Sequence, residues 1–308
     1  MKRLYHYPVM LVLTILSILT LILFEAAAFV QFVLFQPDIY AEAMRTGRID
    51  DVIYDDLTEY FKGFSAPTGI PEEVFLAPLN KEELFDASYA MTVDSISYLT
   101  GNTSSKPTIN YDFGKVTGYV DAYIEQYSAA NHIPQDQSYF DLVNNTNATI
   151  EAQIGSQLDV TMLYSVSGKS YAESVRNFAG YVSKGLIASG ILLVFLVMLM
   201  IVIDRRHPRD LPYWFGIMLV SSSLIILVPA MYLDKIGYFN GFFMQSENVY
   251  RTVTSICNVC LSRIINGETL ILIFGIFLII LTIVIHMIYL NYLKKKQNQP
   301  MHHHHHER

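Results

Sequence analysis

The apolar stretch Val9–Phe35, VMLVLTILSILTLILFEAAAFVQFVLF, decides what kind of protein this chain forms. An α-helix rises about 1.5 Å per residue, so about 20 apolar residues cross a hydrocarbon core of about 30 Å. Three later stretches reach a similar length: Gly185–Ile203, Pro212–Leu233 and Thr269–Leu290. In addition, 52% of all residues are hydrophobic and 16% are charged, whereas soluble domains are about 25% charged. The sequence therefore predicts an α-helical membrane protein with four transmembrane helices.

Basic residues beside these stretches predict the orientation of the chain. They are Lys2 and Arg3 before the first stretch, Arg205, Arg206 and Arg209 between the second and third, and Lys294, Lys295 and Lys296 after the fourth. All fall on one side if every stretch crosses, and basic residues collect on the cytoplasmic side. We expect a multi-pass protein of the cell membrane with both termini in the cytoplasm. Residues Gln36–Lys184 and Asp234–Glu268 then face outward.

The predicted organisation has four parts. They are an N-terminal transmembrane anchor (1–35), an extracytoplasmic helical domain (36–178) inserted between the first and second spans, a three-helix membrane region (179–293) with the outer loop 234–268, and a cytoplasmic tail (294–308). The anchor has one alternative, because the small residues Ala26–Ala28 are typical of a signal-peptide cleavage site. Its apolar core, Pro8–Phe24, is longer than the usual length of about 7–15 residues, so we prefer an uncleaved anchor. The tail ends in His302–His306, which would bind nickel or zinc whether it is a tag or native.

The domain 36–178 is acidic, with 21 Asp and Glu against 8 Lys and Arg. Such a domain repels nucleic acid and anionic headgroups and suits a basic protein partner, a cationic peptide or a basic wall polymer. The simpler interpretation is that the acidic faces only keep the domain soluble.

Apolar residues in this domain recur at helical spacing. Asn80 and Glu83 resemble a capping box at the start of a helix that stops at Gly101. Another helix is predicted over Gly114–Asn131, with Val116, Val120, Tyr123, Ile124 and Tyr127 facing inward. The segment Leu158–Ser165 mixes Val, Thr and Tyr, a composition typical of a strand.

Both cysteines of the chain, Cys257 and Cys260, form a C-x-x-C pair within SICNVCLSRI. Outside the membrane such a pair is a candidate thiol–disulfide centre, and four-span quinone-linked thiol oxidoreductases carry one in an outer loop. Their relay needs a second cysteine pair, and this chain has 2 cysteines. Apolar residues continue a helical stripe through both positions, so we interpret them as packing residues and keep the redox pair as the alternative.

Two polar residues, Glu25 and His286, lie within the apolar stretches. A carboxylate in hydrocarbon is costly and suggests ion or proton handling. Counted from Val9, however, Glu25 lies about 24 Å along the helix, near the outer end of its stretch. His286 lies near the cytoplasmic end of the fourth stretch. Both are therefore expected at the interface, where neither needs a function.

The sequence contains no phosphate-binding loop, no G-x-S-x-G and no H-E-x-x-H, and no cofactor or metal is expected. The acidic run Asp50–Glu59 lacks the ligand spacing of an EF-hand. Small residues in the second and third stretches, such as Gly190 and Ser221–Ser223, permit close helix packing within one bundle or in a homo- or hetero-oligomer.

The segment GIPEEVFLAPLNKEELFDASYAMTVDSISYLTG, Gly69–Gly101, resembles segments of four-pass membrane proteins of Gram-positive bacteria. That resemblance implies an outer domain between the first two spans and implies no activity. The order of one helix, a large domain and three helices is also similar to ABC permeases of the cell-division and macrolide-exporter type. Those permeases need a cytoplasmic surface for their ATPase, and the link Asp204–Leu211 is short for that role.

Three functions are therefore considered. The preferred one is a non-enzymatic membrane protein whose acidic outer domain binds a partner or senses the cell envelope. The alternatives are a permease-like subunit of an exporter and a thiol–disulfide oxidoreductase that uses Cys257 and Cys260.

Overall fold

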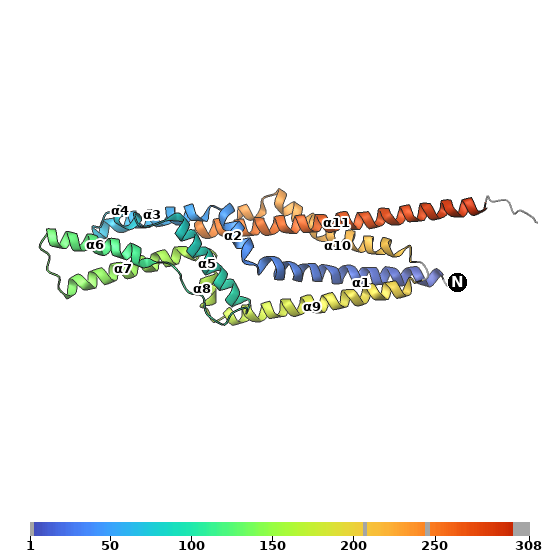
Figure 1. The fold of residues 1–308 in the computed structure, drawn as a ribbon, viewed down its shortest axis with the longest axis horizontal. Helices are drawn as coiled ribbons and strands as arrows, with labels where there is room; N and C mark the ends of the chain where they lie inside the picture. Colours follow the sequence, from blue (N-terminus) through green and yellow to red (C-terminus); the bar gives the residue numbers. More distant parts are fainter. Residues whose placement is uncertain (1–2, 206–207, 244–246, 298–308) are drawn as a thin grey trace, which may run out of the picture. The chain divides into compact units, whose positions relative to one another are not determined.

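The computed structural model describes residues 3–205, 208–243 and 247–297, and these form helices joined by turns (Figure 1). The elements are α1 (Arg3–Phe29), the π-helical turn η1 (Val30–Leu34), α2 (Pro37–Thr46), α3 (Ile49–Thr68), α4 (Glu72–Leu76), α5 (Lys81–Leu99), α6 (Phe113–Ala130), α7 (Gln137–Leu158), α8 (Leu163–Ser167), α9 (Ala172–Ile203), α10 (Leu211–Lys235), the 3₁₀ turn η2 (Tyr238–Gly241) and α11 (Glu247–Gln297). No strand occurs within these ranges, so the predicted helical fold class is confirmed. Three features of the sequence analysis, Lys2, Arg206 and His302–His306, lie outside the described ranges.

Four helices are long and apolar enough to cross a membrane. The segments are Tyr7–Leu34, Ala172–Ile203, Leu211–Lys235 and Glu247–Tyr292. Their number and composition fit the predicted multi-pass membrane protein. The last segment differs from the expected span Thr269–Leu290, because α11 begins at Glu247 and continues unbroken through most of the region expected as a loop.

The chain divides into two compact units, which are described separately. Unit 1 contains the residues up to Ala28, Lys184–Leu233 and the residues from Arg263 onward. Unit 2 contains Phe29–Ser183 and Asp234–Ser262. Unit 1 thus holds the greater part of the apolar stretches, and unit 2 holds α2 to α8.

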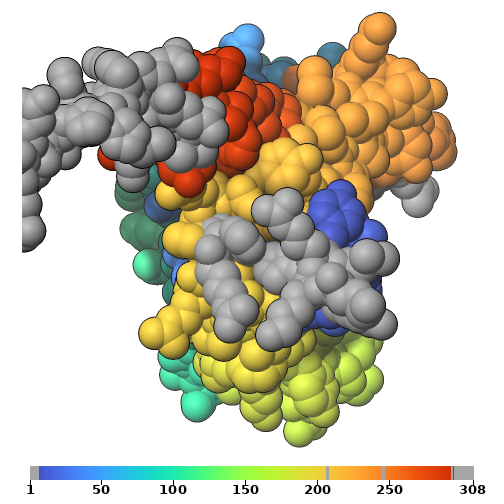
Figure 2. Space-filling view, turned by 90° about the vertical axis from the view of Figure 1, so that its right-hand side faces the viewer, coloured from blue at the N-terminus to red at the C-terminus, as the bar shows by residue number. Residues whose placement is uncertain are grey.

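In unit 1, α1, α9 and α10 share a small apolar core. Its buried members are Met10, Leu13, Leu196, Met200 and Trp214. The Ser17 hydroxyl donates a hydrogen bond to Sδ of Met200 at 3.8 Å, and the ring of Tyr7 lies 5.3 Å from that of Trp214. Figure 2 shows the end of this bundle where α1 begins in blue, next to the yellow segments that flank the α9–α10 link. Many other apolar side chains of these helices are exposed, as expected for surfaces that face lipid.

Helices α10 and α11 approach each other closely through two glycines. A Cβ atom on Gly216 would lie 2.8 Å from the carbonyl oxygen of Gly275 and 2.6 Å from Cγ1 of Ile279. A Cβ atom on Gly275 would lie 3.0 Å from both Cβ of Leu219 and the backbone nitrogen of Val220. Small residues at a crossing allow membrane helices to pack backbone against backbone, and here they hold α10 against α11.

Unit 2 has a separate core, in which the largest buried side chains come from α2, α3, α4, α5 and α7. The rings of Phe61 and Phe75 stack with centroids 4.9 Å apart at its centre. At its edge, Nζ of Lys81 donates to Asp51 at 2.5 Å and thereby ties the start of α5 to α3. This hydrogen bond is the main reason why the pKa of Asp51 lies below its ordinary value.

Local signals in the sequence account for several helix boundaries. The side chain of Asn80 accepts hydrogen bonds from the backbone N–H groups of Glu82 and Glu83 at 2.8 and 3.3 Å, so the predicted cap of α5 is confirmed. Gly101 follows this helix with φ +81°, a conformation that glycine adopts without strain. Helix α6 matches its predicted range of Gly114–Asn131 to within one residue at each end.

The strand-like composition of Leu158–Ser165 gave a wrong expectation. In the structure α7 ends at Leu158 and the short helix α8 begins at Leu163. The Asp159 carboxylate accepts hydrogen bonds from the backbone N–H groups of Tyr164 and Ser165 at 3.1 and 2.8 Å. A side-chain oxygen that satisfies unpaired N–H groups favours the start of a helix over an extended chain.

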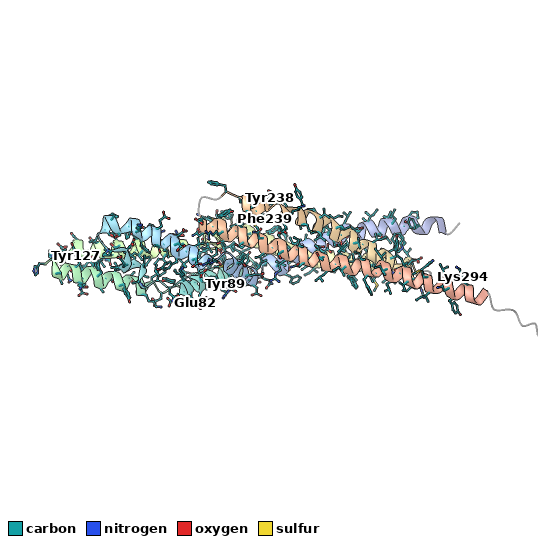
Figure 3. All side chains as sticks on the ribbon, turned by 90° about the horizontal axis from the view of Figure 1, so that it is seen from above. Glu82, Tyr89, Tyr127, Tyr238, Phe239 and Lys294 are labelled. Atoms are coloured by element: carbon teal, nitrogen blue, oxygen red, sulfur yellow. The ribbon has the colours of Figure 1, made fainter. Side chains whose placement is uncertain are left out.

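The second segment of unit 2 joins η2 to the first part of α11. Tyr238 and Phe239 on η2, labelled in Figure 3, form an aromatic cluster with Phe242, which directly follows η2, with ring centroids 5.4 to 5.5 Å apart. The Tyr250 hydroxyl on α11 donates to the backbone carbonyl of Asn240 at 2.9 Å. These contacts fix η2 against the helix that follows it.

Candidate functional site

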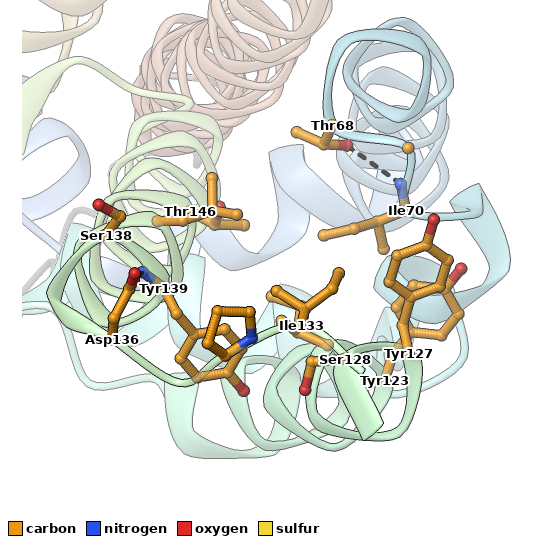
Figure 4. Close-up of a pocket in the computed structure, with 14 residues that line it drawn as sticks. Thr68, Ile70, Tyr123, Tyr127, Ser128, Ile133, Asp136, Ser138, Tyr139 and Thr146 are labelled. Carbon is orange, nitrogen blue, oxygen red and sulfur yellow. Dashed lines mark hydrogen bonds between the residues drawn. The ribbon is translucent and has the colours of Figure 1, made fainter. Parts of the chain in front are cut away.

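A cavity lies in unit 2 between the end of α3, α6 and the first half of α7 (Figure 4). Its volume is about 440 Å³, within the usual range of small-molecule sites of about 300–1,000 Å³. The lining residues are Thr68, Gly69, Ile70, Tyr123, Ile124, Tyr127, Ser128, Ile133, Pro134, Asp136, Ser138, Tyr139, Leu142 and Thr146.

One wall of the cavity is the turn that ends α3. Gly69 takes φ +69° there, and its N–H donates to the carbonyl of Ser65 at 2.9 Å. The left-handed conformation turns the chain so that the next residue, Ile70, is buried with 5% exposure. The hydroxyl of Thr68 accepts a hydrogen bond from the Ile70 N–H at 3.4 Å, shown as the dashed line in Figure 4.

The opposite wall is the link between α6 and α7. His132 adopts φ +54°, and the N–H of Ile133 donates to the carbonyl of Ser128 at 2.9 Å, which closes the end of α6. Asp136 starts α7, because its Oδ1 accepts a hydrogen bond from the N–H of Tyr139 at 3.1 Å. The cavity is thus bounded by helix ends that short-range sequence signals fix.

The cavity combines aromatic and aliphatic surface with a single carboxylate. The rings of Tyr123 and Tyr127 stack with centroids 6.3 Å apart on one side. Tyr127, Ile133 and Leu142 are 52%, 43% and 58% exposed, although all three offer large apolar surfaces. Asp136 is the one charged residue in the lining, so the site has apolar and π surfaces together with negative charge.

Tyr127 on α6 was predicted to face the core, but it is not buried in the structure. Val116, Val120 and Ile124 are buried as expected, whereas Tyr127 lies one turn beyond the core and borders the cavity. Helical spacing alone does not distinguish a ring in the core from a ring at the edge of a cavity, because both lie on the same face.

The cysteines lie on α11, well beyond its first turn. Cys260 is 8% exposed and packs with Ile39, Ala43 and Val259, while Cys257 is partly exposed. Both are free thiols. Neither stands at a helix N-terminus, the position that most favours a reactive thiolate.

Glu25 does not stand alone in the membrane region. Within unit 1 its carboxyl group interacts with the side chain of Ser222 on α10 and lies within electrostatic range of Glu268 on α11. The Ser222 hydroxyl donates to the carbonyl of Leu219 at 3.1 Å. Both Glu25 oxygens and Oε2 of Glu268 are buried without a hydrogen-bond partner among the described residues.

Ser222 also locates this pair along the helices. It stands near the middle of α10, about 18 Å from either end at 1.5 Å per residue. Side chains lean toward the N-terminus of their helix, which carries the Glu25 carboxyl group back along α1, away from the end of its apolar stretch. Sequence alone does not single out Glu268, because this residue directly precedes the apolar run Thr269–Leu290 and falls in the segment predicted as an outer loop.

His286 lies on α11 with its side chain exposed, about 27 Å along the helix from Glu268, so the structure does not bring these two groups together. No cluster of three or more His, Cys, Asp or Glu suited to a metal ion occurs within the described residues. Comparison of the chain with protein-family models, with curated proteins and with solved structures gives no match.

Proposed function

We propose that this chain is a non-enzymatic, multi-pass membrane protein whose acidic unit 2 lies outside the cell and binds a cationic amphipathic molecule in the cavity. The observation that carries the proposal is the composition of the cavity wall. Tyr123, Tyr127 and Leu142 offer aromatic and aliphatic surface beside the carboxylate of Asp136. Tyrosine faces attract cations as well as apolar groups.

The charge around the cavity supports a cationic ligand. Helices α6 and α7 with their link (113–158) contain five acidic residues, namely Asp121, Glu125, Asp136, Asp141 and Glu151, and one basic residue, Lys115. Lys115 is already paired with Glu83 on α5 at 2.7 Å. The field over this face therefore draws cations toward the cavity and repels anions.

The outward orientation of unit 2 rests on the basic residues near the spans. Arg205 and Arg209 lie in the α9–α10 link, and Lys294 follows the apolar part of α11. With these ends in the cytoplasm, the segments 29–183 and 234–262 are extracytoplasmic. In this position the domain meets cationic peptides or basic partners before they reach the lipid.

The test uses the full chain in zwitterionic nanodiscs with a fluorescent amphipathic peptide of lysine and leucine. A matched peptide with glutamate in place of lysine has the same apolar content. We expect saturable binding of the lysine peptide and no binding of the glutamate peptide. Empty nanodiscs report the contribution of the lipid.

Two charge-matched variants locate the binding site. Leu142→Lys puts a positive charge into the cavity wall, whereas Phe140→Lys puts one on the same helix at a side chain that is 50% exposed and outside the lining. We expect Leu142→Lys to weaken binding at least about tenfold, or about 1.4 kcal/mol, and Phe140→Lys to change it little. Equal losses in the two variants, or equal binding of both peptides, would contradict the proposal.

A further inference from the structure

The segment that follows α10 is apolar and aromatic, although it belongs to the largely acidic unit 2. Residues 236–243 read IGYFNGFF, which includes one tyrosine, three phenylalanines and no charged side chain. Phe243 is 96% exposed, and Ile236 and Tyr238 are 51% and 50% exposed. Exposed apolar side chains that lie together in this way mark a surface that binds another protein or a membrane.

Polar atoms of this segment are paired with α11. The Thr254 hydroxyl donates to the carbonyl of Phe239 at 3.5 Å, and Nδ2 of Asn258 donates to Oδ1 of Asn240 at 3.2 Å. The hydrogen bond from Tyr250 to the carbonyl of Asn240 adds to these two. Lipid offers few partners to a polar backbone, so a segment that contacts lipid needs such pairing within the protein.

The position of the segment along the chain decides between a protein and a membrane. Helix α10 has 25 residues and is about 37 Å long, whereas the hydrocarbon core is about 30 Å thick. The ends of α10 therefore reach the headgroup layers. Tyr238 comes three residues after Lys235, the last residue of α10, so their Cα atoms are at most about 11 Å apart. The chain also turns here, because the N–H of Gly237 donates to the carbonyl of Asp234 at 3.0 Å. The segment thus stays at the membrane boundary.

The exposed tyrosines of the spanning helices occupy corresponding positions. Each lies at an end of an apolar stretch or just beyond it; they are Tyr7, Tyr181, Tyr213, Tyr232 and Tyr292. Exposed rings nearer the middle of the stretches belong to phenylalanines, namely Phe195, Phe274 and Phe277. A tyrosine hydroxyl needs a polar partner, so tyrosine collects where hydrocarbon meets water. Tyr238 continues this series directly after α10.

We propose that residues 236–243 form an interfacial anchor that binds the lipid headgroup layer beside the end of α10. Ile236 and Phe243 insert among the upper parts of the acyl chains, to a depth of about 5–10 Å. Tyr238 lies at the level of the headgroups. The partner of this surface is lipid, and the anchor requires neither a ligand in the cavity nor a particular orientation of the chain across the membrane.

The test measures the depth of a fluorophore attached to a single cysteine. It uses the full chain in phosphatidylcholine nanodiscs, with Cys257 and Cys260 replaced by alanine. Phe243→Cys places the fluorophore on the proposed anchor. Ile225→Cys, near the middle of α10 and 55% exposed, is the control within the hydrocarbon core, and Phe140→Cys, on α7 and 50% exposed, is the control in water.

Three quenchers distinguish the possible environments: a lipid with a nitroxide close to the headgroup, a lipid with a nitroxide deep in the acyl chain, and iodide in the water. At position 243 we expect the greatest loss of fluorescence with the shallow nitroxide. Position 225 should respond most to the deep nitroxide, and position 140 to iodide. Strong iodide quenching at position 243 without lipid quenching would overturn the proposal. Protection from all three quenchers would also overturn it, because a second copy or another protein would then cover the segment.

A second measurement keeps the Phe243 ring in place. A fluorophore on Ile236→Cys should also respond most to the shallow nitroxide. Adding Phe243→Asp should shift its quenching toward iodide, because a carboxylate disfavours insertion among acyl chains. Phe140→Asp is the matched control and should cause no shift. If Phe243→Asp also left the quenching at position 236 unchanged, the ring would not hold the segment in the lipid and the anchor would be refuted.

Discussion

Replacing Gly275 with alanine tests the contact between α10 and α11 directly. The new Cβ would lie 2.9 Å from Cγ2 of Val220 and 3.0 Å from Cβ of Leu219, whereas carbon atoms in good contact are about 3.5–4.0 Å apart. The two helices must therefore separate locally by roughly 0.5–1 Å. Overpacking of this kind costs about 1–3 kcal/mol.

Gly267 provides the matched control on the same helix. A Cβ on Gly267 meets nothing within 4 Å, so Gly267→Ala should gain the better helix propensity of alanine, up to about 1 kcal/mol. Gly275→Ala has the same gain, and the difference between the two variants isolates the steric term. We expect Gly275→Ala to be less stable than Gly267→Ala by about 1–3 kcal/mol.

The single tryptophan of the chain makes this difference measurable. Trp214 is 5% exposed in the core of unit 1, so its fluorescence during unfolding in mixed detergent micelles reports on the α1–α9–α10 packing. Equal stability of the two variants would refute the close approach of α10 and α11. Gly216→Ala should resemble Gly275→Ala, because its Cβ would lie still closer to the facing helix.

The remaining predictions concern the thiols, the topology and the acidic surface. Replacing Cys257 and Cys260 with alanine should lower the free energy of unfolding by at most about 1–2 kcal/mol, and both thiols should alkylate slowly in the native protein; rapid alkylation at both would support the redox alternative. In that cysteine-free background, Ser138→Cys should label with an impermeant reagent in intact cells and Gln299→Cys should not, and labelling of the latter would refute the four-span topology. Burial, and secondarily nearby carboxylates, raise the pKa of Asp56, so the folded state binds this proton more tightly than the unfolded state and becomes relatively more stable as the pH falls. Asp56→Asn should therefore raise the melting temperature at pH 7, and this gain should vanish in acid; a gain independent of pH would contradict the sign.

Much of the fold follows from local chemistry in the sequence. The apolar runs predict the four long helices, and the short side chain of Asn80 predicts where α5 begins. The composition of Leu158–Ser165 predicts extended chain, but the Asp159 carboxylate accepts hydrogen bonds from the backbone N–H groups of Tyr164 and Ser165 and starts a short helix. Propensity is a weaker signal than a side chain that satisfies free backbone N–H groups.

The candidate sites were harder to predict, because they depend on residues far apart in the sequence. Glu25 was visible as a charge in an apolar stretch, but its neighbour Glu268 follows it by more than two hundred residues. The apolar stripe through Cys257 indicated a helix before the last span. It did not show that this helix runs unbroken into the apolar run and places Glu268 inside one continuous helix. The sequence pattern does not indicate the cavity, because Tyr127 and Leu142 also fit an ordinary helix face.

The residues that line the cavity differ in how strongly the fold depends on them. Ile70 and Ile124 also belong to the core of unit 2, so substitution at either position endangers the fold. Tyr127, Ile133 and Leu142 are exposed and absent from that core. Substitutions at the three exposed positions should therefore affect the fold less than substitutions at Ile70 or Ile124. The ligand preference proposed for the cavity could therefore change through these three surface positions without a loss of the fold.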